Sequence, residues 1–168
     1  MKISKSRLPA ALKRSARAHI LRKSGGTPGT VQACGANKVA LWGSACNGLP
    51  DQDLHLLRCA AVKSAVRMSP GQSAAATLRA LAASGKHKSL DPAVGHHRQV
   101  IISWASCVWE GLPTLDIMQR TLEQAVAKLR TYKKPWQGVT DPAGAFILTL
   151  GELGLSAASA RQLFIEKG

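Results

Sequence analysis

The most strongly apolar stretch of the chain covers residues 100–109, where eight of ten positions are apolar and two serines interrupt them. Asp91 followed by Pro92 is a typical helix start, and Gly111 is a typical helix stop. We therefore predict a helix over residues 92–110. A membrane-spanning helix needs ~20 apolar residues, so this run is too short to cross a bilayer.

The second half of this predicted helix is apolar on every face, whereas its first half is polar. Such a pattern is typical of a helix whose far end is enclosed by other helices. We therefore expect helices to surround residues 100–109, with Trp104 and Trp109 in the core.

Apolar residues at helical spacing predict further helices on both sides of the central one. The first covers residues 1–24, with Leu8, Leu12, Ala16 and Ile20 on its apolar face. The others cover 31–44 (short or kinked at its glycines), 51–68, 73–83, 114–132, 142–153 and 156–167, with a turn at 135–138. No segment favours a strand as strongly. The predicted fold is all-α, an irregular bundle of seven or eight helices around the central apolar helix.

Composition and chain breaks give the expected domain organisation. With 168 residues the chain fits one domain, and its aromatic content of 4% leaves alanine and leucine to favour helix. The glycine-rich segment 25–29 breaks the chain after the first helix. We expect a basic amphipathic arm over residues 1–24 and a helical domain over residues 25–168.

Positive charge is concentrated at the start of the chain. Residues 1–50 hold nine lysines and arginines and no acid, and the net charge of the whole chain is +14. Such a one-sided balance indicates a polyanionic partner, nucleic acid first and an anionic membrane surface second. Other hypotheses for residues 1–24 are a mitochondrial transit peptide, a helix that simply packs on the domain, and a solvated basic tail.

The candidate contacts to nucleic acid are the basic residues of the first helix, of the following segment and of one loop. They are Arg7, Lys13, Arg14, Arg17, Arg22, Lys23, Lys38, Lys86 and Lys88. Trp42 and Trp136 lie beside glycines near element ends, so either could stack on a base, although burial is the commoner fate of a tryptophan.

No catalytic or metal-binding constellation is predicted, and no cofactor is expected. The four cysteines are far apart and read as reduced, mostly buried thiols of an intracellular protein. His96, His97 and Cys107 lack a second ligand pair at zinc-site spacing. Asp51 and Asp53 read as helix-dipole partners in a first turn.

Several short motifs together resemble one known region. They are Leu41-Trp42-Gly43, Gly48-Leu49-Pro50, Leu54 with Leu57-Arg58, Asp91-Pro92, Trp104 with Trp109, Val139 with Pro142-Ala143 and Ala145, and Leu153-Gly154-Leu155. This set resembles the thumb region that follows the polymerase palm in reverse transcriptases of non-LTR (LINE-type) retrotransposons. The resemblance covers about residues 5–166.

The resemblance implies a helical domain that grips template and primer, RNA or an RNA/DNA hybrid, through backbone phosphates. It places Lys13, Arg14, Arg17, Arg22 and Lys23 at thumb-like positions. The palm's Tyr/Phe-x-Asp-Asp motif is absent, so the chain would be a palm-less fragment and no enzyme, in the nucleus or in a ribonucleoprotein. The alternative is a structural component of a ribonucleoprotein or organellar assembly, with protein neighbours and a targeting or RNA-contacting segment at residues 1–24, the organelle being the mitochondrion.

Overall fold

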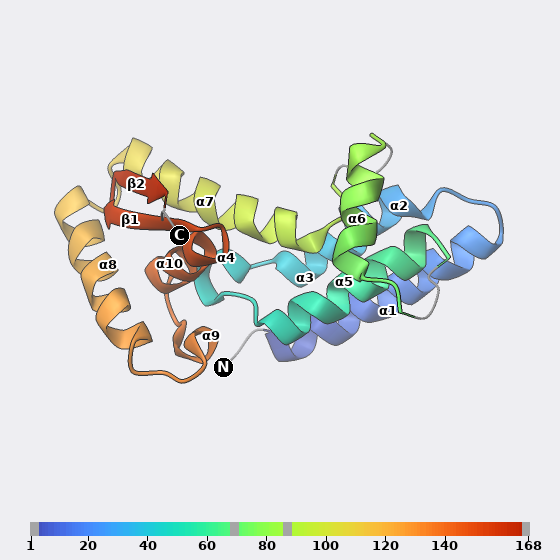
Figure 1. Ribbon diagram of the computed structural model, residues 1–168, viewed down its shortest axis with the longest axis horizontal. Coiled ribbons are helices and arrows are strands. Elements are labelled where there is room, and N and C mark those ends of the chain that lie inside the picture. The colour runs from blue at the N-terminus through green and yellow to red at the C-terminus, as the bar shows by residue number, and fades with distance from the viewer. Residues whose placement is uncertain (1–3, 68–70, 86–88, 166–168) are drawn as a thin grey trace. The chain divides into compact units, whose positions relative to one another are not determined.

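The computed structural model describes residues 4–67, 71–85 and 89–165, which form mainly helices (Figure 1). The helices are α1 Ser4–Lys23, α2 Pro28–Val31, the π-helix η1 Gln32–Asn37, α3 Lys38–Leu41, α4 Ser44–Asn47, α5 Asp51–Ala65, α6 Ala74–Ala83, α7 Pro92–Glu110, α8 Leu115–Leu129, α9 Pro135–Gly138 and α10 Pro142–Glu152. A single hairpin of strands β1 Leu155–Ser159 and β2 Gln162–Ile165 follows within the described part. The predicted all-α class is therefore confirmed as the predominant character of the chain.

The hairpin corrects the helix predicted over residues 156–167. Its strands are antiparallel, with Leu155 opposite Ile165 and Ala157 opposite Leu163. Successive side chains of a strand point to opposite faces, so Leu155 and Ala157 can both pack against the core. The turn that follows offers the carbonyl of Ala160 to the indole Nε1 of Trp104, 3.1 Å away. Tertiary packing thus decides the conformation of a segment whose local propensity is weak.

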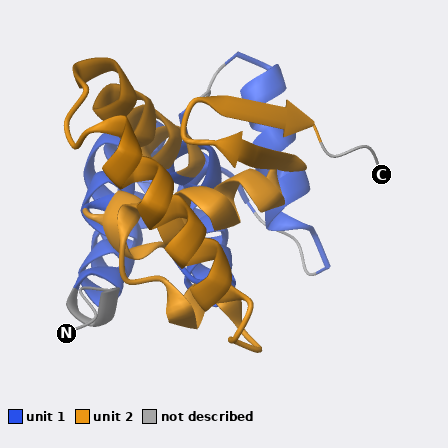
Figure 2. Cartoon of the chain, turned by 90° about the vertical axis from the view of Figure 1, so that its left-hand side faces the viewer, with its two compact units in different colours: residues 1–42, 49–96 blue, residues 43–48, 97–168 orange. Residues whose placement is uncertain are grey.

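The chain divides into two compact units, drawn in two colours in Figure 2. Unit 1 consists of residues 1–42 and 49–96, and unit 2 of residues 43–48 and 97–168. This division differs from the boundary expected at residue 24, because α1 packs along α5 and belongs to unit 1. The first helix is therefore part of a packed unit.

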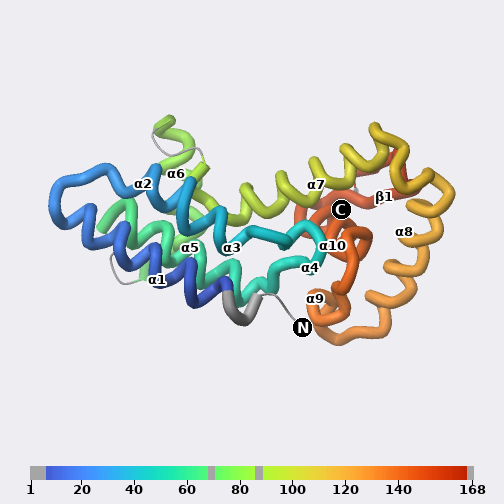
Figure 3. Tube along the Cα trace, turned by 180° about the vertical axis from the view of Figure 1, so that it is seen from behind, coloured from blue at the N-terminus to red at the C-terminus, as the bar shows by residue number. Residues whose placement is uncertain are grey.

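Unit 1 is held together by α1, α5 and the short helices between them, which lie side by side in Figures 1 and 3. The buried face of α1 consists of Ala11, Ser15 and Ala18, whereas Ala16 is exposed and Ile20 keeps 63% of its surface exposed. The predicted apolar face of this helix was therefore wrong at Ala16 and Ile20. Small buried side chains allow α1 and α5 to approach closely.

The segment after α1 is a helical run in which the π-helix η1, which contains Gly35, interrupts the α-helix. Residues 28–41 form two short α-helices separated by the π-helix η1. Inside it, the buried Gln32 Nε2 donates to Asn37 Oδ1 at 2.9 Å, and Asn37 Nδ2 donates to the carbonyl of Leu90 at 2.9 Å. These two side chains are five residues apart, the spacing of the hydrogen bonds in a π-helix. These two buried hydrogen bonds thus stabilise the π-helical turn and connect it to Leu90.

The start of α7 is confirmed at Pro92 and is set by Asp91. Its Oδ1 accepts from the backbone N–H of Ala93 at 2.9 Å and lies 3.1 Å from Arg58 Nε. The carboxylate therefore caps α7 and ties it to α5 within unit 1.

Unit 2 packs α7, α8, α10 and the hairpin around one core. The helix predicted over residues 114–132 forms as α8, and its apolar residues Met118, Leu122, Ala125 and Leu129, three or four positions apart, are buried. Among the residues that the structure describes, other helices do not surround the second half of α7: Val100 and Trp104 are buried, but Trp109 is 92% exposed and Ile102 is 49% exposed. A sequence that is apolar on every face of a helix does not reveal which face will be buried, and in the described part of the chain only one face of this half is.

Candidate nucleic-acid interface

A groove of about 450 Å³ lies on unit 1 between α1 and the helical segment that carries η1 and α3. Figure 3 shows α1 and α3 next to each other. The groove is lined by Arg7 and Arg14 of α1, Cys34 and Gly35 of η1, Lys38 and Val39 of α3, and Trp42. It therefore combines three cationic side chains with one aromatic ring.

The sequence of α1 places two guanidinium groups on the same side of the helix. Arg7 and Arg14 are seven residues apart, close to two full turns, so both project along one edge of the buried face. Lys38, the first residue of α3, lies across the groove from them. Three of the predicted contacts are thus brought together.

Trp42 lies on the surface, against the expectation that burial is its commoner fate. Its exposed fraction is 69%. Trp42 directly follows the last residue of α3, Leu41, and directly precedes Gly43, which turns the chain with a φ of +73°. The guanidinium carbon of Arg7 stands 5.7 Å from the centre of the indole ring, and Arg7 Nη1 donates to the carbonyl of Trp42. A cation over one face of the ring leaves an aromatic surface beside the groove.

The charge of the groove is not compensated within unit 1. No carboxylate lines it, and in the described part of the chain none of Arg7, Arg14 and Lys38 forms an ion pair. Like-charged side chains without counterions create a positive potential that attracts anions from solution.

The remaining predicted contacts fall into four groups. Lys13 and Arg17 are exposed on α1; Arg17 extends the basic surface beyond Arg14, whereas Lys13 points about 100° away from Arg14 around the helix. Arg22 is half-buried, with Nη2 3.4 Å from His19 Nδ1. Lys23 is exposed, but nine residues beyond Arg14 it points about 180° away on a helix that turns ~100° per residue. Lys86 and Lys88 lie outside the described residues.

Sequence reasoning missed Cys34, Gly35 and Val39. Gly35, Lys38, Val39 and Trp42 are three or four residues apart, the spacing that puts side chains on one helix face. This helical spacing was the signal in the sequence that could have placed Gly35 and Val39 beside Lys38 and Trp42. A Cβ at Gly35 would meet nothing within 4 Å, so this residue leaves the groove open.

The other tryptophan candidate, Trp136, has a structural role. It is half-buried in unit 2, and its Nε1 donates to Glu152 Oε1 at 3.0 Å. An added Cβ at Gly48 would lie 2.4 Å from its ring, so the chain packs tightly against it. Its ring is therefore engaged within unit 2.

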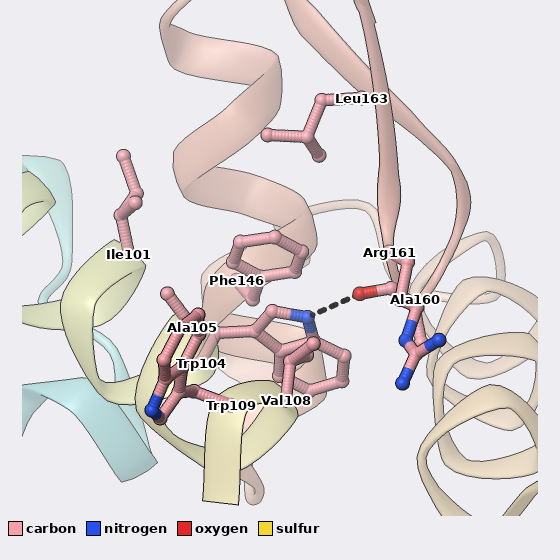
Figure 4. A pocket seen from close by; sticks show the side chains of 9 residues that line it. All are labelled: Ile101, Trp104, Ala105, Val108, Trp109, Phe146, Ala160, Arg161 and Leu163. Carbon is pink, nitrogen blue, oxygen red and sulfur yellow. Dashed lines mark hydrogen bonds between the residues drawn. The ribbon is translucent and has the colours of Figure 1, made fainter. Parts of the chain in front are cut away.

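Unit 2 has a hollow of different character, of about 400 Å³, seen in Figure 4. Trp104 lies at its base, stacked on Phe146 with ring centres 4.6 Å apart, and donates to the Ala160 carbonyl. Apart from Arg161 and the Ala160 backbone, the lining is apolar and includes the exposed Trp109. Such a surface offers an anionic chain one guanidinium only.

The thiols and histidines also depart from expectation. None of the four cysteines is buried: Cys34 and Cys46 are exposed, and the other two are half-buried, all free. His96 is fully buried instead of forming a polar helix start. His97 Nε2 lies 2.7 Å from Glu152 Oε2. In the residues that the structure describes, no group of three or more metal-ligating side chains gathers, and no helix has the length and hydropathy of a membrane span.

No family model, no curated protein and no solved structure matches this chain.

Proposed function

We propose that this chain binds nucleic acid through its phosphates, without sequence specificity and without catalysing a reaction. The observation that carries the proposal is the groove of unit 1, where Arg7, Arg14 and Lys38 surround one hollow with no carboxylate among its lining residues. Arginine and lysine contacts to phosphate oxygens position a strand and do not read its sequence.

The spacing of the two arginines suits successive phosphates of one strand. Seven residues of α-helix separate Arg7 from Arg14 by about 10 Å along the axis. That distance equals the rise of about three nucleotides in a duplex strand, at 3.4 Å for each. The two guanidinium groups would thus hold different phosphates, and Arg17, three residues beyond Arg14 on α1, would lengthen the same track.

The packing of α1 favours a helix that stays with the chain over a removable targeting segment. Ala11 and Ala18 are 0% and 1% exposed, and His19 Nδ1 lies 2.8 Å from the carbonyl of Lys63 in α5. Cleavage near Ser24 would remove these contacts and uncover α5. Sequencing the N-terminus of the mature protein separates the two hypotheses.

The test is the salt dependence of binding to a labelled 20-nucleotide RNA and to an RNA/DNA hybrid of the same length. The triple variant R7A/R14A/K38A removes three phosphate contacts, and the slope of log K against log salt should fall by about two units. The matched control R130A/K133A/K134A removes three exposed charges from unit 2 and should leave the slope unchanged.

Two results would contradict the proposal. One is a wild-type chain that binds neither probe at low salt. The other is an equal loss of slope in the two triple variants, because charge anywhere on the chain would then be sufficient. Thermal unfolding of each variant checks that its fold is intact.

A further inference from the structure

Trp42 is the feature of the groove that phosphate binding does not use. It keeps 69% of its surface exposed, although a large aromatic side chain ordinarily gains by burial. It lies at the groove that holds three cations, so a strand bound by its phosphates there would bring bases within reach of the ring.

The ring is held in place by its neighbour. Arg7 stands over it with its guanidinium carbon 5.7 Å from the ring centre, and the same arginine donates to the Trp42 backbone carbonyl. One face of the indole is thus supported by a cation, and the exposed remainder offers an aromatic plane. Bases stack on such planes whatever their identity.

We infer that Trp42 stacks on an unpaired base, so that the groove takes single-stranded nucleic acid in preference to a paired duplex. The inference rests on the proposed function. In a duplex each base is already stacked and paired, and a side chain at the surface would have to open the helix before it could stack. A single strand can turn a base onto the ring while its phosphates remain with Arg7, Arg14 and Lys38.

The alternative role for Trp42 is purely structural, as a support that orients Arg7. The two roles differ in what they require of the ligand. A support would affect all phosphate binding equally, whereas a stacking platform would matter only where a base is present and unpaired. The hydrogen bond from Arg7 goes to the backbone carbonyl, so it does not depend on the side chain at position 42.

The experiment measures the affinity of the full chain at one low salt concentration for three probes. They are a 12-nucleotide oligouridine, the same strand with abasic sugars in place of its nucleotides, and a 12-base-pair RNA/DNA hybrid. The variants are W42A, W42F and, as control, W109A, whose indole is exposed in unit 2.

If Trp42 stacks on a base, W42A should weaken oligouridine binding about tenfold and change binding to the abasic strand and the hybrid less than twofold. W42F should recover most of the loss, and W109A should have no effect. The wild-type chain should prefer oligouridine to the abasic strand, and W42A should abolish that preference.

Three results would overturn the inference. Equal loss for all three probes in W42A would make Trp42 a support for Arg7. Unchanged affinity for all three would leave phosphate binding standing without stacking. If the wild-type chain binds none of the probes, the proposed function itself fails.

Discussion

The two units present exposed tryptophans in opposite electrostatic settings. Unit 1 contains fifteen lysines and arginines against three aspartates, a formal charge of +12, whereas unit 2 contains eight basic and six acidic residues, a formal charge of +2. Trp42 stands beside three cations, and Trp109 stands in an apolar lining with one arginine. Exposure of an indole therefore does not by itself indicate a ligand. The charge and polarity of the neighbouring side chains determine which ligand the ring could bind.

The largest expected effect concerns the two tryptophans of α7. Trp104 is 8% exposed and stacked on Phe146, so W104A should lower the free energy of unfolding by about 3–5 kcal/mol. Trp109 is 92% exposed, and W109A should change it by less than about 0.5 kcal/mol. Urea unfolding followed by circular dichroism measures both. A large loss in W109A would mean that this face of α7 is covered in solution.

A smaller loss of free energy of unfolding is expected when an ion pair is removed. In unit 1 the side chain of Asp91 is 9% exposed and both caps α7 and pairs with Arg58, so D91A should cost about 2 kcal/mol. In unit 2 the pair of Asp116 with Arg120 is exposed on α8, and D116A should cost about 0.5 kcal/mol. Equal losses in the same urea titration would show that burial of Asp91 does not strengthen its interactions.

The smallest expected effect is a change in the affinity for nucleic acid when one negative charge is added to either unit. Gly35 lines the groove of unit 1 and Gly151 is exposed in α10 of unit 2, and at either position an added Cβ meets nothing within 4 Å. G35E would add a carboxylate to the groove and should weaken oligouridine binding about tenfold at low salt. G151E adds the same charge to the other unit and should leave affinity within twofold. An equal loss of affinity in G35E and G151E would show that the groove of unit 1 is not the preferred binding surface.

The helices that carry clear local signals could be predicted from the sequence. Asp91-Pro92 and Gly111 set the ends of α7, and the stripe of α8 identified its buried residues. These signals are local, because caps and periodicity act within a few residues.

What could not be predicted depends on distant partners. The hairpin at residues 155–165 forms because its turn meets Trp104, more than fifty positions earlier. The exposure of Trp109 depends on which face of α7 finds a neighbour. In α1, the buried face followed the close approach of α5 to alanines instead of the larger apolar side chains.

The candidate site was predicted in part. The excess of basic residues before Asp51 identified Arg7, Arg14 and Lys38, but not that they share a groove, because that depends on how the segment with η1 and α3 packs against α1. Arg22 and Lys23 looked equivalent to the others in the sequence. The structure separates them because one is half-buried and the other points away from the groove.

The π-helical turn at Gln32–Asn37 makes chain length a determinant of this surface. A π-helical turn has the effect of a one-residue insertion into an α-helix. Because an α-helix turns ~100° per residue, deleting one residue there would rotate Lys38 and Trp42 by about that angle relative to the helix before them. Two chains with the same arginines and the same net charge, differing by one residue in this turn, would therefore present different surfaces to a ligand.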